Sequence, residues 1–310
     1  MIKLDGNVIP DKLNYGDTIG IIAPSKPMVE EAIQMLKTGI KNIEGLGFQV
    51  KLGKNVFSNK LRYSASPEEK ADDINTMFQD KEVKMILSAC GGENSFSCLP
   101  FIDYEIIKNN PKILCGFSDS TNYLDAIYTK TGLLTYYQTE VLAFDGSNQF
   151  EIEDFKLRFV EGKIGNTRKK SEWKCLKYGN AAGILVGGNL PSMCNLVGTE
   201  YMPDVEGRIL LLEAYRTSTN FSLADNYVHR LKYHGIFENI KGLIIGHYAG
   251  DTEELKIEDV FLNNLKEYNF PILKCEDIGH NCENIVIPIG GNIRLDATNG
   301  EIEILDCIVK

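Results

Sequence analysis

The segment 112–122 constrains the fold more than any other part of this sequence. Ile113, Leu114 and Cys115 form the short apolar run typical of a central parallel strand, and the residues after Ser118 are of the types that begin helices. A tight turn between a strand and a helix lifts one hydroxyl above the edge of the sheet and leaves backbone N–H groups free beside it. The segment therefore predicts a serine nucleophile, although it lacks the last glycine of the G-x-S-x-G pattern.

Strands and helices alternate through the first half of the chain. Besides the strand at 113–115, we expect buried strands at 18–23 and 85–90 and an alternating strand at 48–52. The residues at 66–69 begin a helix, with proline in its first turn and acids near the positive end of the helix dipole. This alternation is typical of a doubly wound parallel α/β sheet, in which sites lie at the carboxyl ends of the strands.

The second half has a different rhythm, which predicts a second domain. We expect strands at 183–187, 208–213, 242–246 and 285–305, the last with a hairpin turn at 298–300. The one clear helix of this half is expected at 223–233. We predict an α/β domain with a parallel sheet at 1–165, a polar linker at 166–182, and a smaller strand-rich α+β domain at 183–310.

Composition excludes several classes of partner and site. The net charge of −10 argues against nucleic acid or an anionic membrane as the main partner. The first residues lack the apolar core of a signal peptide and no run is long enough to span a membrane, so we expect a cytoplasmic protein. The eight cysteines are scattered without a CxxC pair, which favours reduced thiols. Cys275, His280 and Cys282 lie close together in sequence, but their spacing fits no common zinc pattern, so we predict no metal.

A serine nucleophile needs a base, and the chain has only four histidines. His280 lies in an expected loop between two strands and is the first candidate; His247, at the end of a buried strand, is the second. Glu213 directly follows an apolar strand, so its carboxylate must find a partner, either an imidazole or a cation such as Arg216. The order Ser118, Glu213, His280 matches the Ser…Asp/Glu…His order of α/β-hydrolases.

A glycine pair, Gly91-Gly92, follows the expected strand at 85–90. It could cradle a phosphate, but it has neither the GxGxxG spacing nor a P-loop lysine. The alternative is a backbone N–H donor to an oxyanion beside Ser118, which we favour. Gly187-Gly188-Asn189 is a similar turn, for which a purely conformational role is at least as good an interpretation.

Together these segments resemble the LD-carboxypeptidase family of serine peptidases, which includes the microcin C immunity peptidases. The resemblance runs from about residue 13 to the end and is carried by the following segments in order: 16–25, 91–95, 116–121, 187–190, 211–213 and 279–280. It implies a Ser-Glu-His triad at Ser118, Glu213 and His280, and an oxyanion hole from the amides of Gly92 and Asp119. It also implies a Rossmann-like first domain, a smaller β-rich second domain, a homodimer, and neither metal nor cofactor.

The resulting hypothesis is a serine carboxypeptidase that cuts the bond between an L-centre and terminal D-alanine in cell-wall tetrapeptides. The alternative within the same chemistry is a peptidase for aminoacyl-nucleotide antibiotics of the microcin C type. Glu93 and Arg216 are the expected substrate-binding residues, because the segment 93–95 and the loop 214–222 are the parts individual to this chain. A non-catalytic two-lobed binding protein and an ordinary esterase are the alternatives from other classes.

Overall fold

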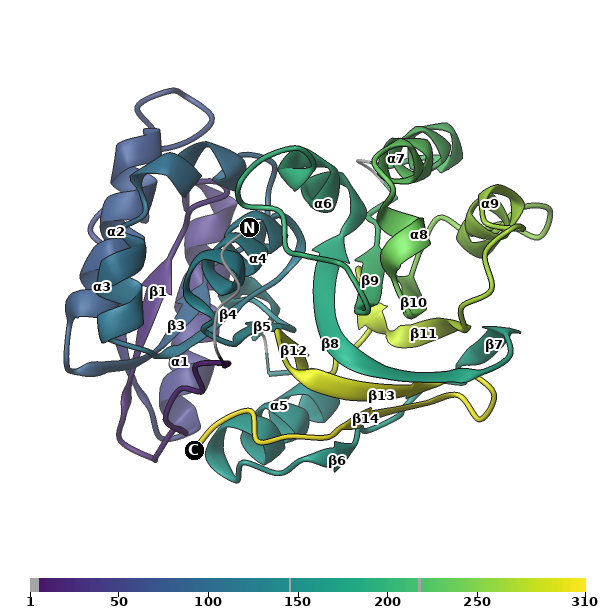
Figure 1. The fold of residues 1–310 in the computed structure, drawn as a ribbon. Coiled ribbons are helices and arrows are strands. Elements are labelled where there is room, and N and C mark those ends of the chain that lie inside the picture. The colour runs from purple at the N-terminus through teal and green to yellow at the C-terminus, as the bar shows by residue number, and fades with distance from the viewer. Residues whose placement is uncertain (1–5, 145, 217–218) are drawn as a thin grey trace.

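Two sheets of different construction lie side by side in the computed structural model (Figure 1). The structure describes residues 6–144, 146–216 and 219–310. The first five residues, which bear on the signal-peptide prediction, and residues 217 and 218 of the loop expected to set specificity lie outside the described ranges. No helix within the described ranges is both long and apolar enough to cross a membrane.

The first sheet has six strands in the order β12-β5-β4-β3-β1-β2. Their bounds are β1 Thr18–Ile22, β2 Gln49–Leu52, β3 Val83–Ser88, β4 Ile113–Gly116, β5 Thr135–Tyr137 and β12 Ile287–Ile289. Strands β1 to β5 pair in parallel, as the alternating pattern predicts, whereas β12 comes from near the end of the chain and pairs antiparallel with β5. The sheet therefore joins two distant parts of the sequence.

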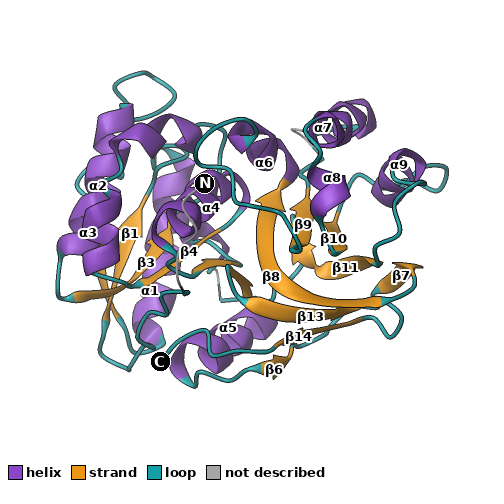
Figure 2. Cartoon of the chain, in the orientation of Figure 1, coloured by secondary structure: helices purple, strands orange, loops and turns teal. Residues whose placement is uncertain are grey.

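The helices of this half alternate with its strands (Figure 2). They are α1 Glu31–Gly45, α2 Pro67–Gln79, η1 Ser95–Phe101, α3 Tyr104–Asn109, η2 Ser118–Ser120, α4 Thr121–Thr131, η3 Val141–Ala143, α5 Gln149–Phe155 and the π-helix η4 Lys156–Val160. Helix α2 begins as the sequence predicts, because Ser66 accepts a hydrogen bond from the Glu69 N–H and the Glu69 carboxylate accepts one from the Ser66 N–H.

The second sheet has eight strands in the order β6-β14-β13-β8-β9-β10-β11-β7. Their bounds are β6 Gly165–Asn166, β7 Lys174–Lys177, β8 Asn180–Asn189, β9 Ile209–Glu213, β10 Gly242–His247, β11 Ile272–Gly279, β13 Asn292–Asp296 and β14 Glu301–Ile304. Its helices are α6 Leu190–Leu196, α7 Phe221–Tyr233, α8 Ile236–Asn239 and α9 Ile257–Asn264. Strands β8 to β11 pair in parallel, and the remaining pairs are antiparallel. A parallel-sheet half followed by a strand-rich half confirms the predicted fold class.

The segment 166–182 differs from the expected linker. It contains the end of β6, all of β7 and the start of β8, so it forms part of the second sheet. Strands β6 and β7 lie at the two edges of the sheet. The polar and basic composition of the segment suits this position, because edge strands are exposed to solvent and often carry charged side chains. The division of the chain into domains at 1–165 and 183–310 stays a prediction.

The parallel strands bring the site together because their carboxyl ends point into the same region. Strand β9 is buried along its whole length, as expected of a central parallel strand covered on both faces. Helix α4, which follows β4 of the first sheet, packs against β8 and α6 of the second half. The end of β4 and the ends of β9 and β11 therefore lie next to one another.

Candidate active site

Ser118 occupies a strained turn directly after strand β4. Its φ of 57° lies in the left-handed region, which costs a residue other than glycine about 1–3 kcal/mol. Thr121 at the start of α4 donates its hydroxyl to the Ser118 carbonyl at 2.7 Å and helps to hold this conformation. Ser118 is partly exposed. The turn thus presents the hydroxyl to the space above the sheet, as the strand–turn–helix pattern predicts.

His280 joins Ser118 to Glu213 although the three residues lie on separate elements. His280 Nε2 is 3.0 Å from Ser118 Oγ, and His280 Nδ1 is 2.7 Å from Glu213 Oε2. Glu213 is the last residue of β9, and His280 directly follows β11. The distances are those of a nucleophile, a base and an orienting acid in sequence. The structure therefore brings together the three residues that the sequence predicts as a triad.

Glu213 is buried, with 2% of its surface exposed, and each of its oxygens has a partner. Tyr137 donates its hydroxyl to Oε1 at 2.7 Å, and Asn189 donates Nδ2 to the same oxygen at 2.9 Å. Burial by itself raises the pKa of Glu213, but the charge of His280 and these hydrogen bonds lower it below its ordinary value. The interpretation of Glu213 as an ion-pair partner of Arg216 is wrong, because the carboxylate binds His280 instead.

Two aromatic rings contact the imidazole of His280. Tyr215 stacks on it with centroids 4.5 Å apart and an interplanar angle of 16°, and Phe117 lies at 4.7 Å in a tilted arrangement. Burial by itself lowers the pKa of His280, but the charge and hydrogen bond of Glu213 raise it above the ordinary value. This environment favours the imidazolium that forms when the base takes a proton.

Tyr137 and Asn189 connect the two sheets at the site. The sequence pattern singles out Asn189 only as part of a turn and does not single out Tyr137. Tyr137 ends β5 of the first sheet and, besides donating to Glu213, accepts the Ser118 N–H at 3.0 Å. Asn189 ends β8 of the second sheet, and its N–H donates to Thr121 Oγ1 at 2.9 Å. Both are polar residues at the ends of buried strands, which is the signal that could have revealed them.

The glycine loop after β3 lies against the nucleophile. A Cβ added to Gly91 would be 3.2 Å from Ser118 Oγ and 2.9 Å from Ser118 Cβ, so a side chain there would have to displace the serine. The Asp119 carboxylate accepts the Ser95 N–H at 2.8 Å, and Ser95 donates its hydroxyl to the Asp119 carbonyl at 2.7 Å. These bonds fasten the loop that carries Gly92 to the turn that carries Ser118.

The two expected oxyanion donors fit this geometry. The Gly92 N–H makes no hydrogen bond to another residue in the described ranges. Asp119 is the second residue of η2, where N–H groups lack a partner in the preceding turn. The oxyanion role of both amides stays a proposal. The two expected substrate-binding residues, Glu93 and Arg216, are both exposed. Arg216 forms no ion pair with a described residue.

The second candidate histidine has a different partner. His247 Nδ1 is 2.6 Å from Glu276 Oε2, on the neighbouring strand β11. The thiol of Cys282 donates to the Gly279 carbonyl, and Cys275 is buried within β11. Across residues 6–144, 146–216 and 219–310 there is no group of three His, Cys, Asp or Glu side chains that could hold a metal ion.

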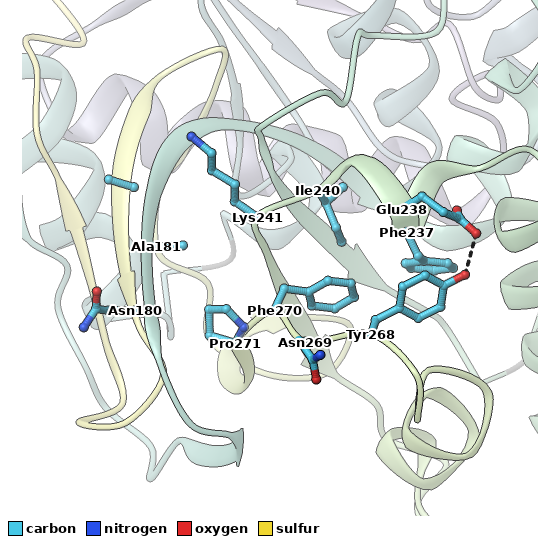
Figure 3. Close-up of a pocket in the computed structure, with 11 residues that line it drawn as sticks. Asn180, Ala181, Phe237, Glu238, Ile240, Lys241, Tyr268, Asn269, Phe270 and Pro271 are labelled. Carbon is cyan, nitrogen blue, oxygen red and sulfur yellow. Dashed lines mark hydrogen bonds between the residues drawn. The ribbon is translucent and has the colours of Figure 1, made fainter.

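A groove of about 550 Å³ lies at the end of the second sheet that is opposite to Glu213 and His280 (Figure 3). Phe237, Tyr268 and Phe270 form its aromatic wall, and Tyr268 donates its hydroxyl to Glu238 at 2.7 Å. Its lining residues begin β8 or precede β10 and β11, whereas Glu213 and His280 lie at or beyond the carboxyl ends of β9 and β11. None of the expected site residues lines this groove.

Comparison with known families and proteins gives a consistent result over nearly the whole chain. Residues 19–138 match the model of the LD-carboxypeptidase N-terminal domain, and residues 182–295 match that of the LD-carboxypeptidase C-terminal domain. A putative carboxypeptidase of Treponema pallidum is 31% identical, over 92% of this chain and 91% of that protein. A probable murein peptide carboxypeptidase of Bacillus subtilis is 30% identical, over 94% of this chain and 92% of that protein.

The third relative is the microcin C7 self-immunity protein MccF of Escherichia coli, which is 28% identical over 95% of this chain and 94% of that protein. A structure of MccF in its wild-type unliganded state superimposes with a TM-score of 0.90 at 26% identity, covering 98% of this chain and 100% of that chain. Another structure of MccF, in complex with aspartyl sulfamoyl adenosine, has a TM-score of 0.88.

Proposed function

Because this chain belongs to the LD-carboxypeptidase family, we propose that it is a serine peptidase in which Ser118, His280 and Glu213 form the catalytic triad. The observation that carries the proposal is the chain of contacts from Ser118 Oγ to His280 Nε2 and from His280 Nδ1 to Glu213 Oε2. A partly exposed hydroxyl, a partly exposed imidazole and a buried carboxylate are what such a triad requires, since only the first two meet the substrate.

The reaction follows from this geometry. Ser118 Oγ attacks the carbonyl carbon of the substrate, and His280 Nε2 takes the hydroxyl proton as the C–O bond forms. The N–H groups of Gly92 and Asp119 donate to the oxyanion of the tetrahedral intermediate. His280 then delivers the proton to the leaving amine as the C–N bond breaks, and water hydrolyses the acyl-enzyme by the same steps with water in place of the serine hydroxyl.

The proposed substrate is a cell-wall peptide with a terminal D-alanine attached to an L-centre. The name of the Bacillus subtilis relative, a probable murein peptide carboxypeptidase, supports this class. The alternative is an aminoacyl nucleotide, which the MccF relative and its complex with aspartyl sulfamoyl adenosine support. Both substrates present one carbonyl to the same nucleophile, so the triad serves either reaction.

Mass spectrometry of digests distinguishes the alternatives. The wild-type protein is incubated separately with a murein tetrapeptide ending in D-alanine and with an aminoacyl sulfamoyl adenosine, and the products are identified by mass. Release of D-alanine supports the carboxypeptidase, whereas release of the nucleotide part supports the second function. If neither substrate changes over long incubation, the proposal fails and a binding protein becomes the better interpretation.

The nucleophile is tested with two serine variants. Ser118→Ala should reduce kcat by roughly 10³-fold or more, because loss of the nucleophile leaves only binding and oxyanion stabilisation. Ser120→Ala is the matched control: Ser120 lies two residues away, is fully buried and accepts the Tyr123 hydroxyl at 2.7 Å. Normal turnover by Ser118→Ala would remove this residue from the mechanism.

The homodimer and the cytoplasmic location are also proposals. Light scattering on the purified protein measures the mass in solution, which is about twice the 34.7 kDa of one chain if the dimer forms. Fractionation of cells that produce the full-length protein tests the location.

A further inference from the structure

Glu140 places a second carboxylate beside the nucleophile, and the triad does not use it. It follows β5 by three residues, and its Oε2 accepts the N–H of Gly91. A Cβ added to Gly91 would be 3.2 Å from Ser118 Oγ and 3.5 Å from Glu140 Oε2, so the glycine lies between the hydroxyl and the carboxylate. Glu140 is partly exposed, which leaves its carboxylate within reach of a molecule bound at Ser118.

No Lys, Arg or His side chain in the described part of the chain forms an ion pair with this carboxylate. The charges of His280 and Lys26 act on Glu140 through space, but neither residue forms an ion pair with it, and Lys26 is exposed to solvent. Burial raises the pKa of Glu140 to about 7, although the Gly91 N–H and the two nearby cations lower it. Removing a charged carboxylate from water is unfavourable when a single N–H group is its only hydrogen-bond donor. A cation on a bound ligand would offset this desolvation cost.

We propose that Glu140 binds a primary ammonium group on the acyl residue of the substrate, which is the residue whose carbonyl Ser118 attacks. The inference rests on the proposed function, because a carboxypeptidase substrate carries its free carboxylate on the leaving residue. Glu140 repels that carboxylate, so the ammonium that it attracts belongs to the other side of the scissile bond. Glu140 thereby favours substrates with a positive charge close to the carbonyl.

Two kinds of acyl residue supply this ammonium. One is a residue with a free α-amino group, as in an aminoacyl compound. The other is an L-diamino acid within a peptide, whose α-nitrogen is in an amide bond and whose side chain carries the amine. The chemistry that Glu140 recognises is the same, and substrates that carry only one of the two amines distinguish the sources.

The test measures kcat/KM for matched peptides ending in D-alanine. The first pair is L-alanyl-D-alanine and its Nα-acetyl form, which differ in the α-ammonium. The second pair is Nα-acetyl-L-lysyl-D-alanine and its Nα,Nε-diacetyl form, which differ in the side-chain ammonium. Glu140→Gln removes the charge but keeps an oxygen that can accept the Gly91 N–H. It should reduce kcat/KM by about 10-fold or more for the cationic member of one pair, since hydrogen bonds to charged groups are the stronger ones.

The neutral member of each pair should change less than about threefold in Glu140→Gln. Glu82→Gln is the matched control, because Glu82 is 81% exposed and directly precedes β3, at the end of the first sheet away from Gly91. It should leave all four values unchanged. Equal losses for cationic and neutral members in Glu140→Gln would show that the charge acts only on His280 and would overturn the inference.

A binding measurement separates failure of this inference from failure of the proposed function. The four peptides are titrated calorimetrically into Ser118→Ala and into the double variant that also carries Glu140→Gln. Preferential binding of a cationic peptide that the second change abolishes supports the ammonium site even if the wild-type protein hydrolyses none of them. Equal binding of cationic and neutral peptides to Ser118→Ala overturns the ammonium site whatever the hydrolysis assays give.

Discussion

Replacing Tyr137 with phenylalanine removes a single oxygen atom at the junction of the two sheets. The Tyr137 hydroxyl accepts the Ser118 N–H at 3.0 Å and donates to Glu213 Oε1 at 2.7 Å, and its side chain is fully buried. Burial and the charge of Glu213 raise the pKa of Tyr137 well above its ordinary value, so the phenol keeps the proton that it donates. The nucleophile and the acid of the proposed triad therefore share one hydroxyl.

The size of the effect follows from these contacts. A hydrogen bond to a charged group contributes about 1.5–3 kcal/mol to the free energy of unfolding, and an unsatisfied buried N–H costs about 1–3 kcal/mol. Asn189 still donates to the same oxygen of Glu213, which limits the loss. We expect Tyr137→Phe to lower the free energy of unfolding by about 2–3 kcal/mol. If about half to all of this loss appears in the transition state, kcat falls roughly 10- to 100-fold.

The assay compares two neighbouring tyrosines. Tyr136 is also fully buried on β5, and its hydroxyl donates to the Ile308 carbonyl on the opposite face of the strand. Tyr136→Phe should therefore cost stability of a similar size without a change in kcat. Both variants are unfolded with urea, and kcat and KM are measured on a peptide ending in D-alanine. The reasoning is refuted if Tyr137→Phe is destabilised but keeps kcat within about twofold of the wild-type value.

Three further predictions follow from the site. His280→Ala should lose roughly 10³-fold or more in kcat, whereas His247→Ala, which removes only the partner of Glu276, should stay within about 10-fold of wild type; the opposite ranking would place the base at His247. His280 must be neutral to accept a proton and its pKa is raised, so kcat/KM should rise with pH to a midpoint above 6.5; a pH profile with a midpoint below that value contradicts this. Arg216→Ala should raise KM for a peptide with a free terminal carboxylate more than for its amide; equal changes would show that Arg216 does not read the carboxylate.

Local sequence patterns determined most of the individual elements. The apolar run before Ser118 predicts β4, and the run before Glu213 predicts β9, because a strand covered on both faces has no polar positions. The same reasoning offers Ser118, Glu213 and His280 as candidates, since each is a polar residue of suitable chemistry at the end of a buried strand or directly after one. It offers His247 as well, and the resemblance to a known family, rather than the local pattern, set the triad. These features depend on neighbours in sequence, which a single chain displays.

Tertiary structure alone decided which distant segments meet. Strand β12 leaves the second half of the sequence to pair with β5, and the polar segment expected as a linker supplies β6 and β7 of the second sheet. The contacts of Tyr137 and Glu140 with the nucleophile region likewise join residues on separate loops and strands. No local periodicity encodes such pairings, because they result from packing the two sheets so that the buried hydrogen-bonding groups of one find partners in the other.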